Sequence, residues 1–369
     1  MKSRAAVLWE GAKEWQVEDV DLDGPKEGEV LVQMAAAGLC HSDEHLITGD
    51  MPGVLPMIGG HEGSGIVQEV GPGVKSLQPG DHVSMSFIPS CGKCRMCTTG
   101  RQNLCDTGAM LLAGKMLDGT ARVHAKGQDL HLMAAVGTFA SHQVVSEMSL
   151  IKVEPDLPLP QVALVSCGVA TGWGSAVQRA QVVPGDIVVV VGVGGIGANA
   201  VQGARMAGAR MVFAVDPLEF KREQAMNLGA THTAASMAEV EPTLRELSWG
   251  TMADKVILTP GVMYGDLLGP AMALTGKGGT CVVTAVAPWM QMDVQLSLFD
   301  LAMSNKEIKG TIFGSLNPRA DIPKLLDLYR QGDLKLDELI TRRYPLDDIN
   351  LGYQDMRDGT NIRGVIVFD

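Results

Sequence analysis

The sequence predicts an α/β protein with two domains, a β-rich, barrel-like domain and a doubly wound domain built on a parallel sheet. At 369 residues the chain is long for a single hydrophobic core. Roughly the first 160 residues consist of short apolar and polar alternations separated by Gly and Pro, which is typical of strands. From about Gln161 the pattern changes to long apolar segments, including the β-branched run Ile187–Val191, which is typical of a buried parallel strand.

Composition and charge narrow the class of protein. The chain is 46% hydrophobic and 20% charged, and its net charge of −12 argues against nucleic acid or an anionic membrane as a partner. The N-terminus lacks the apolar length of a secretory signal. The uncharged run 187–204 contains Asn199, Gln202 and several glycines, which do not favour a membrane span. We expect a cytoplasmic protein.

The first domain can be followed in order. Ala5–Trp9 and Glu29–Met34 alternate as strands do, and so do residues 63–71 and 80–85. Residues 106–140 are rich in Met, Gly and His without periodicity, so we expect a long loop there.

The second domain alternates strands and helices. After the strand at 187–191, a helix is predicted over 198–207 and a second strand over 211–215. The remaining predictions are helices at 220–228 and 265–275 and strands at 255–258, 279–284 and 309–314. A helix at 322–330 and a closing strand at 362–368 follow, and we expect that strand to return to the first domain.

Seven cysteines without an export signal suggest metal binding rather than disulfides. Four of them form one short motif, Cys91, Cys94, Cys97 and Cys105. Four thiolates close a tetrahedron around zinc and leave no open position, so the motif predicts a structural site. Iron–sulfur ligation fits the spacing less well, and unligated loop cysteines are the other alternative.

A second metal site is predicted from residues far apart in the chain. Cys40 and His61 are ligands that zinc prefers, and a catalytic zinc needs three protein ligands and an open position. Cys167 is the candidate third ligand. The competing interpretation makes Cys40 and Cys167 core thiols and His61 a structural histidine. Cys281 lies in an apolar run and is expected in the core.

The sequence Gly192-Val-Gly194-Gly195-Ile196-Gly197 follows a strand and opens a helix, which is the context of a dinucleotide-binding loop. Gly192 permits the tight turn, Gly194 lets the backbone approach the pyrophosphate, and Gly197 allows close helix packing. Asp216 lies 19 residues after Gly197 at the end of the next strand. Its carboxylate can accept hydrogen bonds from ribose hydroxyls and would repel a 2′-phosphate, which favours NAD over NADP. Lys221 is a further candidate for cofactor binding.

Together these motifs resemble those of the zinc-dependent alcohol dehydrogenases in the medium-chain dehydrogenase/reductase superfamily. The resemblance covers essentially the whole chain, including Cys40–Asp43, Gly60–Glu62, Cys167–Gly172 and Ile362–Arg363. It implies a GroES-like catalytic domain at 1–168 and 313–369 and a Rossmann NAD-binding domain at 169–312. The segment 215–222 and the Met-rich loop resemble the actinobacterial branch that often retains NAD and uses a nitroso acceptor.

The resemblance also implies roles for individual residues. Cys40, His61 and Cys167 would hold the catalytic zinc, Asp43 would orient His61, and Glu62 would lie near the metal. Ser42 and His45 would relay the alcohol proton by way of the cofactor ribose, with His45 at the solvent end. Residues implied to contact the cofactor are His41, Thr171, Val286 and Arg363, and residues implied to line the substrate pocket are Phe87, Val286 and Ile312.

We therefore expect an enzyme with two zinc ions per subunit that transfers hydride reversibly between a primary alcohol, or aldehyde, and NAD through a zinc-bound alkoxide. A nicotinoprotein with permanently bound NAD(H) is one alternative. Another is a thiol-dependent formaldehyde dehydrogenase, for which Lys115, Arg122 and Lys126 offer basic groups. A non-catalytic zinc- and nucleotide-binding protein is a remote alternative, because no ligand or relay residue is missing. The resemblance implies a homodimer or homotetramer joined through the edge strand of the cofactor domain, which we expect near 292–304.

Overall fold

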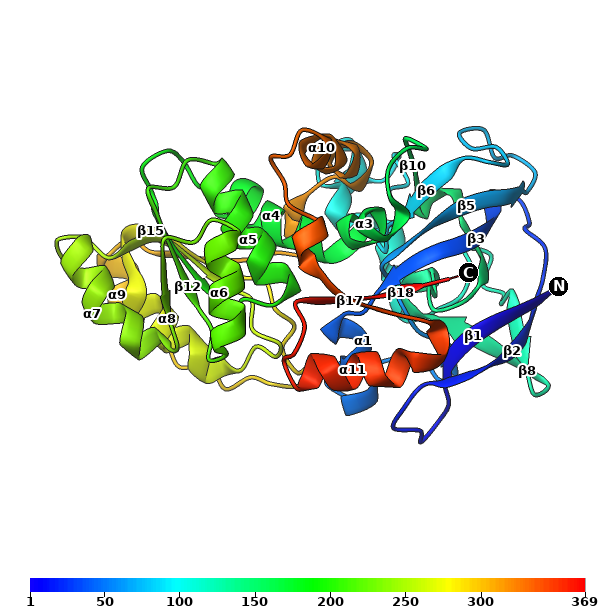
Figure 1. Cartoon of the computed structure of the whole chain (residues 1–369), viewed down its shortest axis with the longest axis horizontal. Helices are drawn as coiled ribbons and strands as arrows, with labels where there is room; N and C mark the ends of the chain where they lie inside the picture. Colours follow the sequence, from blue (N-terminus) through cyan, green and yellow to red (C-terminus); the bar gives the residue numbers. More distant parts are fainter. Residues whose placement is uncertain (369) are drawn as a thin grey trace. The chain divides into compact units, whose positions relative to one another are not determined.

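The computed structural model describes residues 1–368, and it describes the side chains of all of these except 109–111. Backbone contacts divide the chain into two compact units. The first contains Met1–Cys167, Asn317–Gln331 and the chain from Leu336 onward, and the second contains Gly168–Leu316 and Gly332–Lys335 (Figure 1). The domain boundaries at 168/169 and 312/313 stay a prediction.

A closed barrel forms one part of the first unit, which confirms the predicted barrel-like domain. The strand order is β1-β2-β7-β8-β4. The bounds are β1 Lys2–Leu8, β2 Gln16–Leu22, β4 Met57–Ile58, β7 Val123–Ala125 and β8 Gln128–Leu132. Val7, Ile58 and Leu130 pack together inside it, because alternate residues of each strand point inward. The prediction of a long loop over 106–140 was wrong, since β7 and β8 lie within that segment.

The second sheet of this unit has the order β10-β6-β5-β3-β18-β17, with β9 paired to β3. The bounds are β3 Glu29–Gly38, β5 Gly63–Val70, β6 His82–Met85, β9 His142–Ser146, β10 Leu150–Val153, β17 Ile340–Tyr344 and β18 Arg363–Val367. Strand β18 runs antiparallel to β3, with Val365 opposite Gly38, and the two lie side by side in Figure 1. The C-terminal strand therefore returns to the first unit, as predicted.

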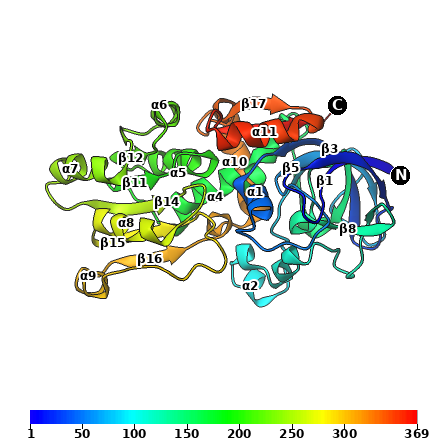
Figure 2. The same ribbon diagram turned by 90° about the horizontal axis from the view of Figure 1, so that it is seen from below.

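The second unit is built on a parallel sheet of order β13-β12-β11-β14-β15-β16 (Figure 2). The bounds are β11 Ile187–Val191, β12 Met211–Val215, β13 His232–Ala234, β14 Ala253–Leu258, β15 Thr275–Val283 and β16 Glu307–Gly310. The sheet confirms the predicted doubly wound domain. The last strand was predicted over 309–314 but ends at Gly310, because Phe313 and Gly314 adopt positive φ values of 56° and 62°.

Helices cover both faces of this sheet. Val189 and Phe213 pack on one face with Val240 of α7 and Met272 of α8, and Cys281 lies fully buried in the same core, as predicted. Helix α5 contacts β11, β12 and β14, and α6 contacts β12 and β13. The bounds are α5 Gly195–Met206, α6 Glu219–Asn227, α7 Met237–Leu247, α8 Leu268–Leu274 and α9 Leu298–Met303.

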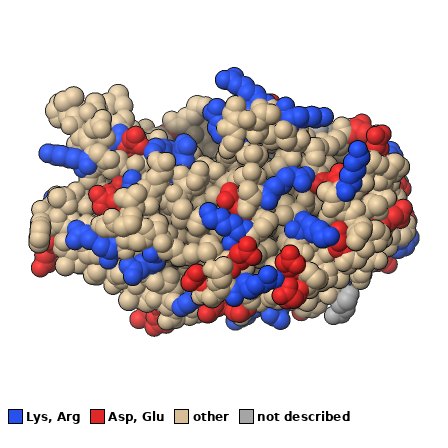
Figure 3. Space-filling view, turned by 90° about the horizontal axis from the view of Figure 1, so that it is seen from above, with Lys and Arg blue, Asp and Glu red and all other residues tan. Residues whose placement is uncertain are grey.

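The remaining helices are α1 His41–Thr48, α2 Arg95–Thr98, α3 Leu159–Leu164, α4 Ala170–Gly174, α10 Pro318–Arg330 and α11 Ile349–Arg357. Within the described part of the chain, no helix combines the length and the apolar character needed to cross a bilayer. Lys and Arg are interspersed with Asp and Glu on the face drawn in Figure 3, so the charge of that face is mixed.

A buried ion pair fastens the segment before β7 to the start of β3. Arg122 is 1% exposed. Its Nε donates a hydrogen bond to Glu29 Oε2 at 2.8 Å, and its Nη2 donates one to Glu29 Oε1 at 2.6 Å. Nη2 also donates to Asp118 Oδ2 at 2.8 Å. A bidentate pair of this kind supplies hydrogen-bond acceptors and a counterion to a guanidinium that water cannot reach.

We predict that Arg122→Met lowers the free energy of unfolding by about 3–5 kcal/mol, because it leaves the Glu29 carboxylate buried without its counterion. Urea denaturation monitored by circular dichroism measures the change. The double variant Arg122→Met/Glu29→Gln should recover much of the loss. A loss below about 1 kcal/mol in the single variant would mean that the pair is not needed for stability.

Candidate active site and metal sites

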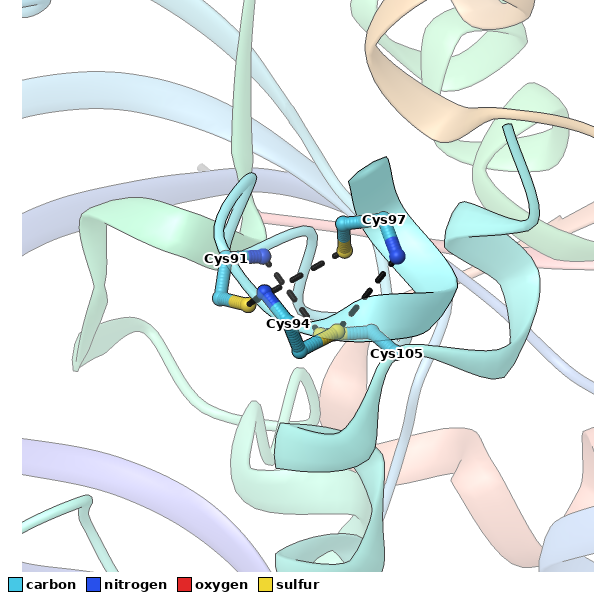
Figure 4. Close-up of side chains that lie close together, drawn as sticks. All are labelled: Cys91, Cys94, Cys97 and Cys105. Atoms are coloured by element: carbon cyan, nitrogen blue, oxygen red, sulfur yellow. Dashed lines mark hydrogen bonds between the residues drawn. The ribbon is translucent and has the colours of Figure 1, made fainter. Parts of the chain in front are cut away.

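The four clustered cysteines converge on a single point. Their Sγ atoms all lie within 4.8 Å of one another. Cys91 Sγ and Cys97 Sγ are 3.9 Å apart, and Cys94 Sγ and Cys105 Sγ are 4.0 Å apart (Figure 4). All four are free thiols. Zinc–sulfur bonds of about 2.3 Å place the sulfurs of a tetrahedral site about 3.8 Å apart, so this donor set fits a zinc ion closed on all sides.

Backbone N–H groups point at the sulfur atoms of this cluster and stabilise negative charge on them. The N–H groups of Cys97 and Asp106 each point at Cys94 Sγ from 3.4 Å, and the N–H of Cys94 points at Cys91 Sγ from the same distance. Hydrogen bonds from the backbone of Lys93 and Cys94 lower the pKa of Cys91 to about 6, against the opposing effect of burial. Burial raises the pKa of Cys97 to about 12. The backbone hydrogen bonds therefore favour the thiolate form of Cys91.

A second convergence of donor groups is buried in the first unit. Ligand atoms of Cys40, His61, Glu62 and Cys167 lie within 4.8 Å of one another, and all four residues are buried. Cys40 precedes the first residue of α1, while His61 and Glu62 lie between β4 and β5. Cys167 lies in a π-helical turn, Val165–Val169, a local irregularity that is frequent at functional sites. Two sulfurs and an imidazole nitrogen match the ligand set of a catalytic zinc.

Asp43 contacts the segment that carries His61. Its Oδ1 accepts a hydrogen bond from Gly60 N at 2.8 Å and lies 3.3 Å from His61 Nδ1. Gly60 has φ = +87°, and a Cβ there would lie 2.4 Å from Thr138 Oγ1, so only glycine fits the bend before His61. With Nδ1 facing a carboxylate, Nε2 of His61 is the nitrogen available to a metal.

The pKa values of the two thiols in this cluster are shifted in opposite directions. A hydrogen bond from Cys167 holds the pKa of Cys40 well below its usual range, although burial opposes the shift, and His61 contributes in the same direction. The same hydrogen bond and burial raise the pKa of Cys167 well above its usual range. Burial alone would lower the pKa of His61, but the nearby Asp43 and Cys40 charges raise it well above its usual value. A divalent cation would neutralise this concentration of donor groups.

Glu62 and Arg363 form a buried ion pair beside the cluster. Arg363 Nη2 bonds to Glu62 Oε2 and also donates to Leu39 O at 3.2 Å. Burial raises the pKa of Glu62 to about 7, and Arg363 opposes the shift. Glu62 Oε1 and Arg363 Nε have no hydrogen-bond partner among the described residues. The resemblance implied that Glu62 lies near the metal and that Arg363 contacts the cofactor, but it did not indicate that the two side chains pair.

Three other predicted residues lie on α1, which begins at this cluster. Cys40 Sγ lies 3.7 Å from Ser42 Oγ, so the predicted relay hydroxyl lies beside a predicted ligand. The rings of His41 and His45 are 6.4 Å apart between centroids. His45 was expected at the solvent end of the relay, but the structure leaves it only 2% exposed. Its relay role stays a prediction.

The glycine loop of the second unit makes a tight turn into α5. Gly192 has φ = +87°, and a Cβ on Gly197 would lie 1.9 Å from Gly192 O, so helix and strand approach closely. A Cβ on Gly194 would meet no atom within 4 Å, so that side of the loop is open. Gly195 begins α5, and Ile196 follows it, so this end of the helix carries backbone N–H groups for a phosphate.

Asp216 follows β12 and faces the loop. Its Oδ2 accepts from Val193 N at 2.8 Å, and its Oδ1 accepts from Leu218 N at 3.0 Å, so the carboxylate braces the glycine loop. Each oxygen retains a further lone pair for a ribose hydroxyl. Lys221 lies near the start of α6 and is partly exposed.

The predicted pocket residues, and the predicted cofactor contact Thr171, belong to different units. In the first unit, the Phe87 ring meets the His61 ring edge-on, with centroids 5.6 Å apart. Thr171, Val286 and Ile312 belong to the second unit, where Thr171 is buried, Val286 is partly buried and Ile312 is exposed.

Sequence reasoning missed Asp50, which contacts His45. Its only signal was the Gly49-Asp50 pair, typical of a turn directly after a helix.

Comparisons with known proteins agree with this architecture. Residues 26–155 match the family model described as an alcohol dehydrogenase GroES-like domain, and residues 195–331 match the zinc-binding dehydrogenase model. The chain is 52% identical over 367 residues to an NDMA-dependent alcohol dehydrogenase of Amycolatopsis methanolica, covering 100% of this chain and 99% of that protein.

Two solved structures extend the similarity. An alcohol dehydrogenase zinc-binding domain protein from Burkholderia ambifaria is 32% identical with a TM-score of 0.93, covering 100% of this chain and 99% of that one. Benzyl alcohol dehydrogenase from Acinetobacter calcoaceticus is 30% identical with a TM-score of 0.91, and both chains are covered completely. The fold, the motifs and these relatives confirm the resemblance, and the chain belongs to the zinc-dependent alcohol dehydrogenases of the medium-chain dehydrogenase/reductase superfamily.

Proposed function

We propose that this enzyme transfers hydride reversibly between a primary alcohol, or its aldehyde, and NAD, and that each subunit binds one catalytic and one structural zinc ion. The buried convergence of Cys40, His61 and Cys167 carries the proposal, because it joins two thiols with a carboxylate-oriented imidazole, three donors that zinc prefers. The Cys91–Cys105 cluster supplies the four thiols of the structural site.

Each residue around the catalytic ligands has a physical task. Asp43 holds the His61 tautomer, and the Arg363 guanidinium balances the Glu62 carboxylate where water is excluded. A zinc ion held there would act as a Lewis acid toward the substrate hydroxyl. Ser42 and His45 are the two side chains of α1 that we assign to move the released proton.

NAD is the cofactor that the second unit fits best. The open side of Gly194 and the N–H groups at the start of α5 suit a pyrophosphate. The buried Asp216 carboxylate already braces the loop, so the 2′-phosphate of NADP would be placed against a fixed negative charge. His41, Thr171, Lys221, Val286 and Arg363 remain proposed cofactor contacts.

The substrate is proposed to be an apolar primary alcohol, because an aromatic side chain, Phe87, packs against His61. The thiol-dependent alternative loses support from two of its three basic residues. Arg122 is buried in its pair with Glu29, and Lys126 Nζ lies 3.0 Å from Glu18 and 4.0 Å from the centre of the Trp9 ring.

A second candidate is a nicotinoprotein that retains NAD(H) and passes hydride to an external acceptor. The 52% identity to a relative named as an NDMA-dependent alcohol dehydrogenase supports this second candidate. Both candidates share the same zinc site and glycine loop, so only cofactor exchange separates them.

Self-association is the remaining part of the proposal. The prediction of an edge strand near 292–304 was wrong, because residues 298–303 form α9 and the sheet ends at β16, Glu307–Gly310. Large apolar side chains in the segment before β16 are nonetheless exposed: Met292 at 93%, Phe299 at 78% and Leu298 at 72%. Such an exposed apolar patch is typical of a protein interface. We propose that a second copy of this chain covers it.

The first prediction from this proposal concerns the two zinc sites. Cys167→Ser should lower the zinc content from about two ions per subunit to about one and reduce alcohol oxidation by about 100-fold or more, because a Lewis acid worth several kcal/mol is lost. Cys105→Ser should also remove about one ion but act mainly by lowering the melting temperature. Metal analysis and thermal denaturation measure both. Cys281→Ser is the control, and equal zinc content in all three variants would contradict the assignment.

The second prediction separates the two candidate functions. Purified protein mixed with a primary alcohol and excess NAD should produce many equivalents of NADH per subunit, measured by absorbance at about 340 nm. A rise that stops near one equivalent, with alcohol oxidation continuing only while an added nitroso acceptor is consumed, would replace the dehydrogenase with the nicotinoprotein. No absorbance change under either condition would overturn both.

The third prediction concerns assembly. Phe299→Lys should shift the mass measured by light scattering toward that of a single chain, because it places an unpaired charge in an apolar contact. Trp249→Lys, which changes another exposed aromatic residue, should leave the mass unchanged. If the native protein already has the mass of one chain, the proposed interface is absent.

A further inference from the structure

His45 has a carboxylate partner that the sequence did not indicate. His45 Nδ1 lies 3.3 Å from Asp50 Oδ2, and the same oxygen accepts a 2.6 Å hydrogen bond from Thr48 Oγ1. The His45 side chain is 3% exposed, whereas that of Asp50 is 24% exposed. The carboxylate therefore lies between a buried imidazole and water.

The end of α1 is built to place Asp50 there. The helix ends at Thr48, and Gly49 adopts the left-handed conformation with φ = 82°. The N–H groups of Gly49 and Met51 both bond to His45 O at 3.1 Å, so the chain folds back over the last turn of the helix. The intervening residue, Asp50, is held against the His45 ring by the same turn.

The two carboxylates on α1 itself have different partners. Asp43 accepts from Gly60 N and faces His61, and Glu44 Oε1 accepts from Arg357 Nη1 at 2.8 Å. The Asp50 carboxylate lies beside the His45 ring. Thr48 in turn orients Asp50, and this hydrogen bond contributes most to the lowered pKa of that carboxyl group.

We propose that Asp50 is the positioning residue of His45: its carboxylate accepts the Nδ1 proton of the neutral ring and leaves Nε2 as the basic nitrogen. An imidazole whose one nitrogen donates to a carboxylate must receive a proton on the other. When Nε2 takes up the proton released by substrate, the positive charge of the ring faces the Asp50 carboxylate. The inference rests on the proposed function of His45 as a proton acceptor.

Asp50→Asn tests the proposal, because the amide keeps the size of the carboxylate but can donate a hydrogen bond to Nδ1 and so favours the Nε2–H tautomer. The full-length, zinc-loaded protein is labelled with ¹⁵N-histidine, and His45→Gln identifies the His45 ring signals. We expect the wild-type ring to show the Nδ1–H pattern of ¹⁵N shifts and Asp50→Asn to show the Nε2–H pattern. We also expect kcat for alcohol oxidation to fall by about 10-fold or more.

Matched variants separate this role from a structural one. Glu44→Gln removes the same charge from a neighbouring acid and should leave the His45 tautomer unchanged. Asp50→Glu should keep the Nδ1–H tautomer and recover part of kcat. Asp50→Ser provides a second test should the Asn variant fold poorly, as judged by its melting curve.

The outcomes are distinct. If Asp50→Asn retains both the Nδ1–H tautomer and kcat within about twofold of wild type, the inference is overturned. A changed tautomer with unchanged kcat would also overturn it, because Asp50 would then orient a ring that alcohol oxidation does not use. Absence of alcohol oxidation in the wild-type protein would instead overturn the proposed function, and the ¹⁵N shifts would still show whether Asp50 orients His45.

Discussion

The candidate active site depends on one buried carboxylate. Asp43 is fully buried, and it joins helix α1 to the segment that precedes β5 through Gly60 N and His61 Nδ1. Because Asp43 lies three residues after Cys40, this contact fixes the separation between a candidate thiolate ligand and a candidate imidazole ligand. Without it, the bend at Gly60 would lose a hydrogen bond that no water replaces, and His61 would be free to adopt either tautomer.

Buried charges elsewhere in the first unit follow the same principle. Two of them are paired across a long sequence separation, Glu62 with Arg363 and Glu29 with Arg122. Burying a charge is costly unless a partner and hydrogen bonds compensate it, so these pairs favour one arrangement of strands over alternatives. The Glu62–Arg363 pair also joins the C-terminal strand β18 to the ligand cluster, so the last residues of the chain complete a site that begins at Cys40.

Much of this architecture could be predicted because its signals are local. The β-branched run 187–191, the glycine loop after it and the Cys-x-x-Cys spacing each describe a contiguous segment. The strands β7 and β8 were missed because they are only three and five residues long, and their pairing with β2 and β4 is a tertiary contact. The partners of Arg363 and Arg122 were missed for the same reason, and Asp50 because a turn, not a periodicity, places it beside His45. The roles of the individual site residues stay predictions.

The central claim is that two chemically different donor sets, one of four thiols and one of two thiols with an imidazole, each hold a zinc ion. X-ray absorption at the zinc edge of the purified protein tests it directly. The account predicts an average first shell of about three sulfurs and one lighter atom per zinc, because a four-sulfur site and a site with two sulfurs, one nitrogen and one oxygen contribute equally. A first shell of four sulfurs alone would contradict it, because zinc would then occupy the Cys91–Cys105 cluster and leave the Cys40, His61 and Cys167 site without its proposed metal.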